Sequence, residues 1–359
     1  MDVLIHENRE YLGRIGSSTT FRTSLATEMF IKQISAIRPI VSAEVYQAFF
    51  TFFTYANFFV VLVGIFSNIL VIVAYSKLGF SETVNISYLA LGISDLSVSV
   101  IRSWGAICFA FTLTNTNVPF DPVSLSSTTV FYPAQGFEKT TAFITAFIAL
   151  ERCLCVQFPL HVKTIVTRRK SIIVMLMIFL LVFVPSNLIH VVNIHRWIYS
   201  PTRNRTILVV VPLQTSLRYI IQRALYAYYG TILHLTALIA VWICTIFLAV
   251  GLKRKAEIRK ENFKNSINAE KNKRKESHVI KTVFLLAITY LICSTPTAAT
   301  LLVPHFVPEF SSLRGLARIS RICHYASALL TQLNSSANLF IFAYMGSKFR
   351  QTLLALFGK

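Results

Sequence analysis

The sequence predicts an all-α membrane protein: a seven-transmembrane helix bundle that ends in a short amphipathic C-terminal helix. The first observation is composition, since 54% of the 359 residues are hydrophobic and only 14% are charged, against about 25% charged in soluble domains. The second is the recurrence of long uncharged stretches, and the third is the helical spacing of the polar residues inside them. The net charge of +20 could indicate a nucleic-acid partner, but one basic groove would leave the uncharged stretches unexplained. We therefore expect a lipid bilayer as a partner and no nucleic acid.

Seven stretches of the chain are candidate membrane spans, because a helix needs about 20 mostly apolar residues to cross the hydrocarbon core of a bilayer. Five contain no Asp, Glu, Lys or Arg, and they lie between Glu44 and Lys77, Lys170 and Arg196, Arg223 and Lys253, Lys281 and Glu309, and Arg321 and Lys348. Two more carry charge inside an apolar stretch: 84–111 contains Asp95 and Arg102, and 125–157 contains Glu138 and Lys139.

The last segment predicts a helix of a different kind. Gly346 ends the seventh span and is followed by SKFRQTLLALF, in which Phe349, Leu353, Leu354 and Phe357 share one helical face. An apolar face beside basic residues is typical of a helix that lies along a membrane surface. We therefore divide the chain into an extracellular tail (1–44), a seven-transmembrane domain (45–345), and a juxtamembrane helix with a short cytoplasmic tail (346–359).

Orientation follows from the basic residues in the loops, which favour the cytoplasmic side. The loops 76–84, 153–171, 252–281 and 345–359 hold 19 Lys and Arg, 11 of them in 252–281, whereas the segments on the opposite side hold 13. This predicts a multi-pass plasma-membrane protein with an extracellular N-terminus. The glycosylation sequon that begins at Asn204 then lies outside the cell, which agrees.

Polar residues inside the spans fall on shared helical faces. A charge at the centre of a span costs about 2.5–3.5 kcal/mol, so it normally faces the bundle interior with a partner. In the third span, Glu138, Thr141, Thr145 and Arg152 form one stripe. The other polar groups that would meet it in an inner column are Asp95, Asn334, Ser335 and Asn338.

These residues resemble the rhodopsin-like (class A) G-protein-coupled receptors. The motifs that carry the resemblance are Asn68 in GIFSN, Asp95 in LALGISDL, ALERCLCVQFPL around Arg152, Cys293-Ser294-Thr295-Pro296, and Asn338-Leu339-Phe340-Ile341-Phe342. The stretch KTTAFITAFIALERCLCVQFPLHVK also resembles molluscan-type chemosensory or peptide-like receptors. The resemblance implies a receptor that converts binding of an extracellular ligand, a small molecule or peptide, into activation of a heterotrimeric G protein.

The resemblance also implies roles for residues at the cytoplasmic side. Arg152 would be held by Glu151 and by Glu276 until the receptor activates, and Leu160, next to Pro159, would dock into the G protein. Pro296 would kink the sixth span, and Asn338 and Phe342 belong to the motif of the seventh span. The alternatives are an arginine that simply reaches the membrane interface and a proline that is merely structural.

The resemblance further implies a sodium pocket, formed by Asp95, Thr141, Asn334, Ser335 and Asn338. These side chains carry the oxygen ligands that hard cations prefer. The alternative is a hydrogen-bonded core without metal. We expect no required cofactor, with sodium as an allosteric ligand at most.

Departures from the family pattern are equally specific. Ser127 stands where the family has the cysteine that bridges the third span to the second extracellular loop, and the loop 194–223 contains no cysteine, so that disulfide is absent. Cys108 and Cys323 either pair instead or remain thiols. Ser294 replaces the usual tryptophan and Leu339 the usual proline.

The residues of the spans exclude two classes of ligand and favour a third. Gln332 stands where retinal would need a lysine, and Ala134 where an amine would need an aspartate, so both ligand classes are excluded. The ligand-pocket candidates are Arg102, Glu138 and Lys139, and the basic residues predict a ligand with an anionic group. The alternative is that Arg102 simply pairs with Glu138 and the extracellular loops are merely solvated.

Other function classes compete with the receptor interpretation. A seven-span ion channel or transporter could use the Asp95 column as an ion path, but transporters usually show internal repeats and none is visible. An insect-type odorant channel of reversed topology disagrees with the basic segment 252–281. An enzyme has no support, since the sequence shows no nucleophile–base set and no phosphate-binding loop.

Overall fold

The computed structural model describes residues 40–114, 117–158, 162–201, 203–261, 267–310 and 316–358. It divides into two units. The smaller comprises 1–49 with 302–323, and the larger 50–301 with 324–359. In the smaller unit, Arg318 Nη1 donates to the carbonyl of Val41 at 2.7 Å. All the side chains discussed below belong to the larger unit, except Cys323.

The helices match the seven predicted spans. The first two spans are α3 (Ala43–Leu78) and α4 (Thr83–Leu113). The third comprises α5 (Pro122–Ser126), η1 (Ser127–Phe131) and α6 (Tyr132–Gln157). After α7 (Val162–Ile165), the fourth comprises α8 (Arg168–Ile178), η2 (Phe179–Phe183) and η3 (Val184–Val191). The fifth comprises α9 (Ser216–Leu225), η4 (Tyr226–Leu233) and α10 (His234–Glu261). The sixth span is α11 (Ile267–Phe306), which the short helix η5 (Pro308–Phe310) follows. The seventh is α12 (Ala317–Met345), and α13 (Ser347–Leu356) comes after it.

Six of the described helices are long and apolar enough to cross a membrane. The seventh predicted span, α12, has 29 residues but buries a run of polar side chains, among them Gln332, Asn334, Ser336 and Asn338. These polar side chains lower the hydropathy of α12, and they are buried in the structure. The predicted all-α bundle is confirmed, and its seventh helix carries polar side chains that hydrogen bond to α4.

The third and fourth spans are irregular where a proline interrupts the helix. Pro133 and Pro185 lack the N–H that the regular pattern needs. The π-helical segment η1 ends just before Pro133. The π-helical segment η2 ends just before the 3₁₀ segment η3, which contains Pro185. Such segments are common sites of local adjustment in a helix.

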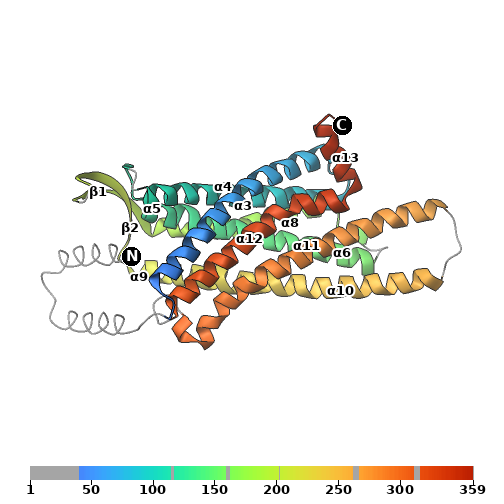
Figure 1. Ribbon diagram of the computed structural model, residues 1–359. Helices are drawn as coiled ribbons and strands as arrows, with labels where there is room; N and C mark the ends of the chain where they lie inside the picture. Colours follow the sequence, from blue (N-terminus) through green and yellow to red (C-terminus); the bar gives the residue numbers. More distant parts are fainter. Residues whose placement is uncertain are drawn as a thin grey trace. The chain divides into compact units, whose positions relative to one another are not determined.

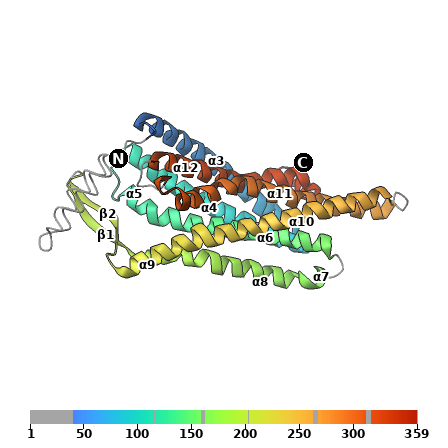
Figure 2. The same cartoon turned by 90° about the horizontal axis from the view of Figure 1, so that it is seen from below.

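Within the larger unit, the helices lie side by side lengthwise, with a β-hairpin at one end and α13 at the other (Figures 1 and 2). The hairpin pairs β1 (Asn193–Ser200) with β2 (Arg205–Pro212) in antiparallel register, from Asn193↔Pro212 to Ser200↔Arg205. β2 is rich in β-branched residues, and β1 contains isoleucine, tryptophan and tyrosine, all of which favour strands. We call the two ends of this unit the hairpin end and the α13 end.

A backbone joint connects the hairpin to the start of the third span, where the family pattern would have a disulfide. The N–H of Asp121 donates to the carbonyl of Leu208 at 2.8 Å, and the N–H of Leu208 donates to the carbonyl of Pro119 at 2.9 Å. The N–H of Val210 donates to Ser124 Oγ at 3.2 Å. Asp121 also caps α5, since its Oδ2 accepts from the N–H of Ser124 at 2.8 Å. The predicted absence of the family disulfide therefore coincides with a set of hydrogen bonds that joins the same two segments.

Arginine side chains extend this joint. Arg203 Nη1 donates to the carbonyl of Phe120 at 3.3 Å, and Arg205 Nη2 donates to the carbonyl of Val118. Neither arginine is among the site residues predicted from the sequence. Cys108 and Cys323 are both free thiols, which is the second of the two alternatives considered for them.

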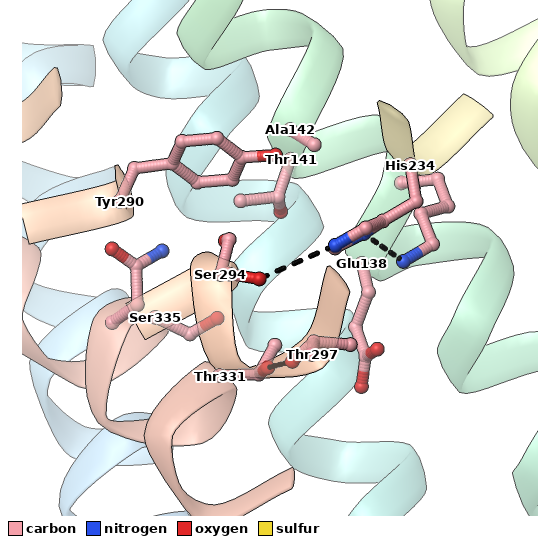
Figure 3. Close-up of a pocket in the computed structure, with 11 residues that line it drawn as sticks. Glu138, Thr141, Ala142, His234, Tyr290, Ser294, Thr297, Thr331 and Ser335 are labelled. Carbon is pink, nitrogen blue, oxygen red and sulfur yellow. Dashed lines mark hydrogen bonds between the residues drawn. The ribbon is translucent and has the colours of Figure 1, made fainter. Parts of the chain in front are cut away.

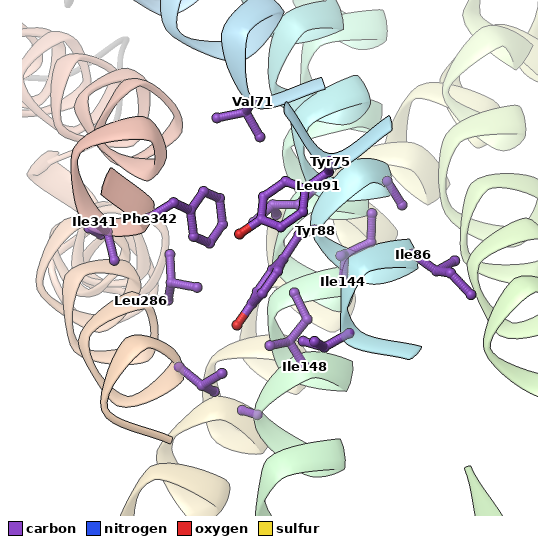
Figure 4. Close-up of a cluster of buried hydrophobic side chains, with 14 of the residues drawn as sticks. Val71, Tyr75, Ile86, Tyr88, Leu91, Ile144, Ile148, Leu286, Ile341 and Phe342 are labelled. Carbon is purple, nitrogen blue, oxygen red and sulfur yellow. The ribbon is translucent and has the colours of Figure 1, made fainter. Parts of the chain in front are cut away.

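At the α13 end, four aromatic side chains form a buried cluster, and Figure 4 labels three of them, Tyr75, Tyr88 and Phe342. The aromatic cluster consists of Tyr75 in α3, Tyr88 in α4, Phe342 in α12 and Phe349 in α13. Ring centroids lie 4.6 Å apart for Tyr88 and Phe342, and 5.1 Å apart for Tyr75 and Phe349. Such separations are typical of favourable aromatic pairs. Phe342, predicted from its motif, is 1% exposed.

The predicted apolar face of α13 is divided between two environments. Phe349 is 2% exposed and belongs to the aromatic cluster, with Leu353 packed against the same core. Leu354 is 46% exposed and Phe357 is 63% exposed. The four residues therefore do not act as one membrane-facing surface, because Phe349 is used to attach the helix to the bundle.

Near the middle of the larger unit, Gly64 brings three helices together. A Cβ atom at this position would lie 2.7 Å from Ser99 Oγ of α4 and 2.8 Å from Ser336 Oγ of α12. Around it, Gln332 Nε2 donates to Ser99 Oγ at 2.9 Å, and Ser336 Oγ donates to the carbonyl of Val60 at 3.1 Å. The close approach of α3, α4 and α12 requires the absence of a side chain here.

Candidate functional site

The interior polar residues meet around Asp95, which is fully buried in α4. Its Oδ1 accepts from Thr141 Oγ1 of α6 at 2.8 Å, and its Oδ2 accepts from Asn338 Nδ2 of α12 at 2.6 Å. Thr141 also contacts Ser94 Oγ at 3.0 Å, and Ser335 hydrogen bonds to Asp95. The sequence analysis placed Asp95, Thr141, Ser335 and Asn338 in one column from helical spacing, and the structure brings them together.

Asp95 forms no ion pair within the described part of the chain. A buried carboxylate without a cation is costly, so such groups are normally paired, bound to a metal or neutralised. The hydroxyls of Ser94, Thr141 and Ser335 are ligands suited to a hard cation. By charge and by chemistry, these residues fit a sodium ion.

Asn334 lies on a cavity next to this group rather than in direct contact with Asp95. The cavity has a volume of about 20 Å³, which is enough for one water-sized group. Thr141 and Ser335 line it as well, so it adjoins the surroundings of Asp95 (Figure 3). The remaining lining residues are Glu138, Lys139, Ala142, His234, Tyr290, Ser294, Thr297 and Thr331.

Lys139 lies on this cavity and is 5% exposed. Its Nζ is 2.8 Å from Nδ1 of His234, and His234 Nε2 is 3.3 Å from the carbonyl oxygen of Ser294 (Figure 3). An ammonium only donates, so Nδ1 accepts and Nε2 carries the hydrogen that it donates to Ser294. These contacts connect α6, α10 and α11. The sequence analysis named Lys139 but missed His234, which lies in a span that otherwise gave no polar signal.

Arg102 and Glu138 form an ion pair, with 18% and 11% of their side chains exposed. The guanidinium donates twice to Glu138 Oε1, through Nη2 and through Nε at 3.1 Å. This is the alternative considered in the sequence analysis, in which Arg102 pairs with Glu138. Arg102 is therefore already paired with an acid on the facing helix, and its contact with a ligand stays a prediction.

At the α13 end, Arg152 Nη2 donates to Glu151 Oε1 at 3.0 Å. The same oxygen accepts from Thr83 Oγ1 of α4. Glu151 is 2% exposed and Arg152 is 15% exposed, so the pair is well shielded from solvent. The expected contact between Arg152 and Glu151 is present, and Thr83 is a partner that the sequence analysis missed.

The remaining predicted residues are Pro159, Leu160, Glu276, Pro296 and Asn204, and only some of them lie in the described part of the chain. Pro159 and Leu160 lie outside the described residues, as does the side chain of Glu276. Pro296 lies inside α11, where its missing N–H leaves the carbonyl four residues earlier without its helical donor. Asn204 is exposed in the turn of the hairpin with φ of 48°, and its glycosylation stays a prediction.

A bundle of seven long helices, a polar centre around Asp95 and a shielded glutamate–arginine pair near one end define a seven-helix receptor of the G-protein-coupled class. The family model of the serpentine type 7TM GPCR chemoreceptor Srw matches residues 55–359. The chain belongs to this family.

Curated relatives agree. The chain is 28% identical to mouse (Mus musculus) neuromedin-U receptor 2 over 304 residues, which cover 82% of this chain and 72% of that receptor. It is 27% identical to the rat (Rattus norvegicus) protein, with 80% and 71% covered, and 24% identical to the human (Homo sapiens) protein, with 83% and 70% covered. The chain is therefore a membrane-embedded G-protein-coupled receptor for an extracellular ligand and not a seven-span ion channel.

Proposed function

We propose that this receptor resides in the plasma membrane with its N-terminus and hairpin end outside the cell, and that it activates a heterotrimeric G protein at the α13 end. The observation that carries the proposal is the contact of Arg152 with Glu151 and, through the same oxygen, with Thr83. Ligand binding shifts the bundle toward a second state in which this contact opens and Arg152 becomes available to the G protein. The basic segment 252–281 supports the same orientation.

The test of coupling is Arg152→Ala in cells that express the receptor with an N-terminal epitope tag. Candidate odorants and peptides are screened with a second-messenger readout, and Arg169→Ala, an exposed arginine in α8, is the control. We expect Arg152→Ala to abolish the response while surface staining of unpermeabilised cells stays normal. An undiminished response, or a tag that stains only after permeabilisation, would contradict the proposal.

The ligand is proposed to be a chemosensory small molecule, in keeping with the name of the family model. The small cavity beside Lys139 supports a small ligand group at its deepest point. A peptide ligand is the second candidate, because the relatives are receptors for neuromedin-U. Running both compound sets in the same screen separates the two.

We also propose that sodium is an allosteric ligand held near Asp95 by Thr141, Ser335, Asn334 and Asn338. The support is the buried carboxylate that forms no ion pair in the described residues. We expect the purified receptor to melt at a higher temperature in sodium chloride than in choline chloride of equal ionic strength. Asp95→Asn should remove the difference, and Ser97→Ala, whose hydroxyl bonds only to Ile93 in its own helix, should keep it. If the wild type melts at the same temperature in sodium chloride and in choline chloride, the residues around Asp95 form a hydrogen-bonded core without metal.

A further inference from the structure

Lys139 is the unmatched charge of the cavity. Glu138 is the one acid that lines the cavity, and it is already paired with Arg102 by two guanidinium hydrogen bonds. Asp95, the nearby buried acid, does not line the cavity and forms no ion pair with Lys139. The three charges Arg102, Glu138 and Lys139 therefore leave one positive charge in a buried place.

The present partner of that charge is a weak one. Lys139 Nζ contacts the neutral ring nitrogen Nδ1 of His234 at 2.8 Å, whereas an ammonium has three hydrogens to donate. Within the described chain, this is its one hydrogen bond. A buried ammonium that meets a neutral acceptor keeps most of its desolvation penalty, and a carboxylate would offset it far better.

His234 is held in place for this contact. Its Nε2–H donates to the backbone carbonyl of Ser294 in α11, and this bond leaves the Nδ1 lone pair directed at Lys139 (Figure 3). Because the carbonyl belongs to the backbone, the ring orientation does not depend on a second side chain. His234 is therefore a positioning residue that occupies the place where an anionic partner of Lys139 would bind.

The other walls of the cavity can hold the oxygens of such a partner. Thr297, Thr331 and Tyr290 bring hydroxyl groups to the cavity from α11 and α12, and the hydroxyl oxygens of Thr297 and Thr331 lie 3.5 Å apart. The volume of about 20 Å³ holds one water-sized group, so a carboxylate also needs the space that the ring of His234 would vacate. The rest of such a ligand would extend out of the cavity.

We propose that this cavity is a binding site for the carboxylate group of a small organic acid, in which the carboxylate replaces His234 as the partner of Lys139. This deepens the proposed ligand recognition and rests on it. The exchange also removes a direct side-chain connection between α6 and α10. Binding and signalling thereby involve the same pair of residues.

The test uses the purified receptor and acetate as the probe. Thermal melting is followed as sodium acetate replaces sodium chloride, which keeps sodium and ionic strength constant while chloride carries no carboxylate. We expect the wild-type melting temperature to rise with acetate and to saturate. Lys139→Met should abolish this rise, and Lys77→Met, an exposed lysine in the last turn of α3, should leave it unchanged.

One further variant and the melting temperature of Lys139→Met without acetate distinguish a binding role from a structural one. His234→Leu removes the competing acceptor, so the half-maximal acetate concentration should fall about five-fold, the equivalent of one ordinary hydrogen bond. Lys139→Met should melt at a higher temperature than the wild type without acetate, because it removes a buried charge. An acetate effect that survives Lys139→Met, or that weakens in His234→Leu, would overturn the proposal. Since melting reports binding without a G protein, failure of the Arg152 experiment would not be confused with failure here.

Discussion

The third span is secured differently at its two ends. At the hairpin end, backbone hydrogen bonds join Asp121 and Leu208, and α5 begins at the cap that Asp121 provides. At the α13 end, the ion pair of Glu151 and Arg152 lies beside a core of closely packed rings. The hairpin end relies on many small contributions of which none dominates, whereas the α13 end concentrates its stability in a few buried side chains. Single substitutions should therefore affect the two ends very unequally.

The largest expected effect is Phe342→Ala, which removes a ring that contacts Tyr75, Tyr88 and Phe349. Truncation of a buried phenylalanine lowers the free energy of unfolding by about 3–5 kcal/mol. We expect a large fall in the melting temperature of the detergent-solubilised receptor. Phe340→Ala, two residues earlier but 61% exposed, is the control and should melt close to the wild type. Equal losses in the two variants would show that the cluster contributes nothing particular to stability.

An intermediate effect is expected for Thr83→Val, which removes the hydroxyl that donates to Glu151. A hydrogen bond to a charged group is worth about 1.5–3 kcal/mol. We expect Glu151 to hold Arg152 less firmly, so that ligand-independent G-protein activation rises at least several-fold in cells with matched surface expression. Thr54→Val is the control, because the Thr54 hydroxyl bonds to its own helix backbone at Phe50. Unchanged basal activity would separate the Thr83 contact from the activation step.

The smallest effect is expected at the hairpin end. Ser124→Ala removes the acceptor of the Val210 N–H and should cost about 1 kcal/mol, seen as a small fall in melting temperature. Ser126→Ala, in the same short helix with its hydroxyl bonded to Val123, should have less effect.

Dithiothreitol should leave the ligand response intact, since the joint contains no cysteine. Loss of the response on mild reduction would show that a disulfide is needed after all.

Much of this arrangement could be predicted from the sequence, because a bilayer imposes simple constraints on helix length and on buried charge. Shared helical faces, together with the cost of burying polar groups without partners, predicted that Asp95, Thr141 and Asn338 meet, and the structure joins them by hydrogen bonds. Helical periodicity reports which residues share a face, and a polar residue in a span must face inward. The sequence therefore predicted the bundle and its polar centre from local patterns.

The partners that lie on a different helix were harder to predict. Nothing in the local sequence around His234 or Thr83 indicates which distant side chain each one meets. Whether Arg102 is free or paired depends on whether Glu138, on a different helix, faces it. The sequence of either helix alone does not show this. The joint at Leu208 uses backbone groups, which every residue has, so no side-chain pattern marks it.

The absence of a side chain at Gly64 also bears on how the receptor can move. The interhelical spacing there has no room for even one methyl group, and hydroxyl and amide hydrogen bonds join α3, α4 and α12 around it. Those three helices thus make a stationary frame, and we expect the displacement that accompanies activation to be taken up by α10 and α11, which line the cavity from the other side. A spectroscopic distance measurement between α3 and α4 would then serve as the fixed reference against which motion elsewhere in the receptor is read.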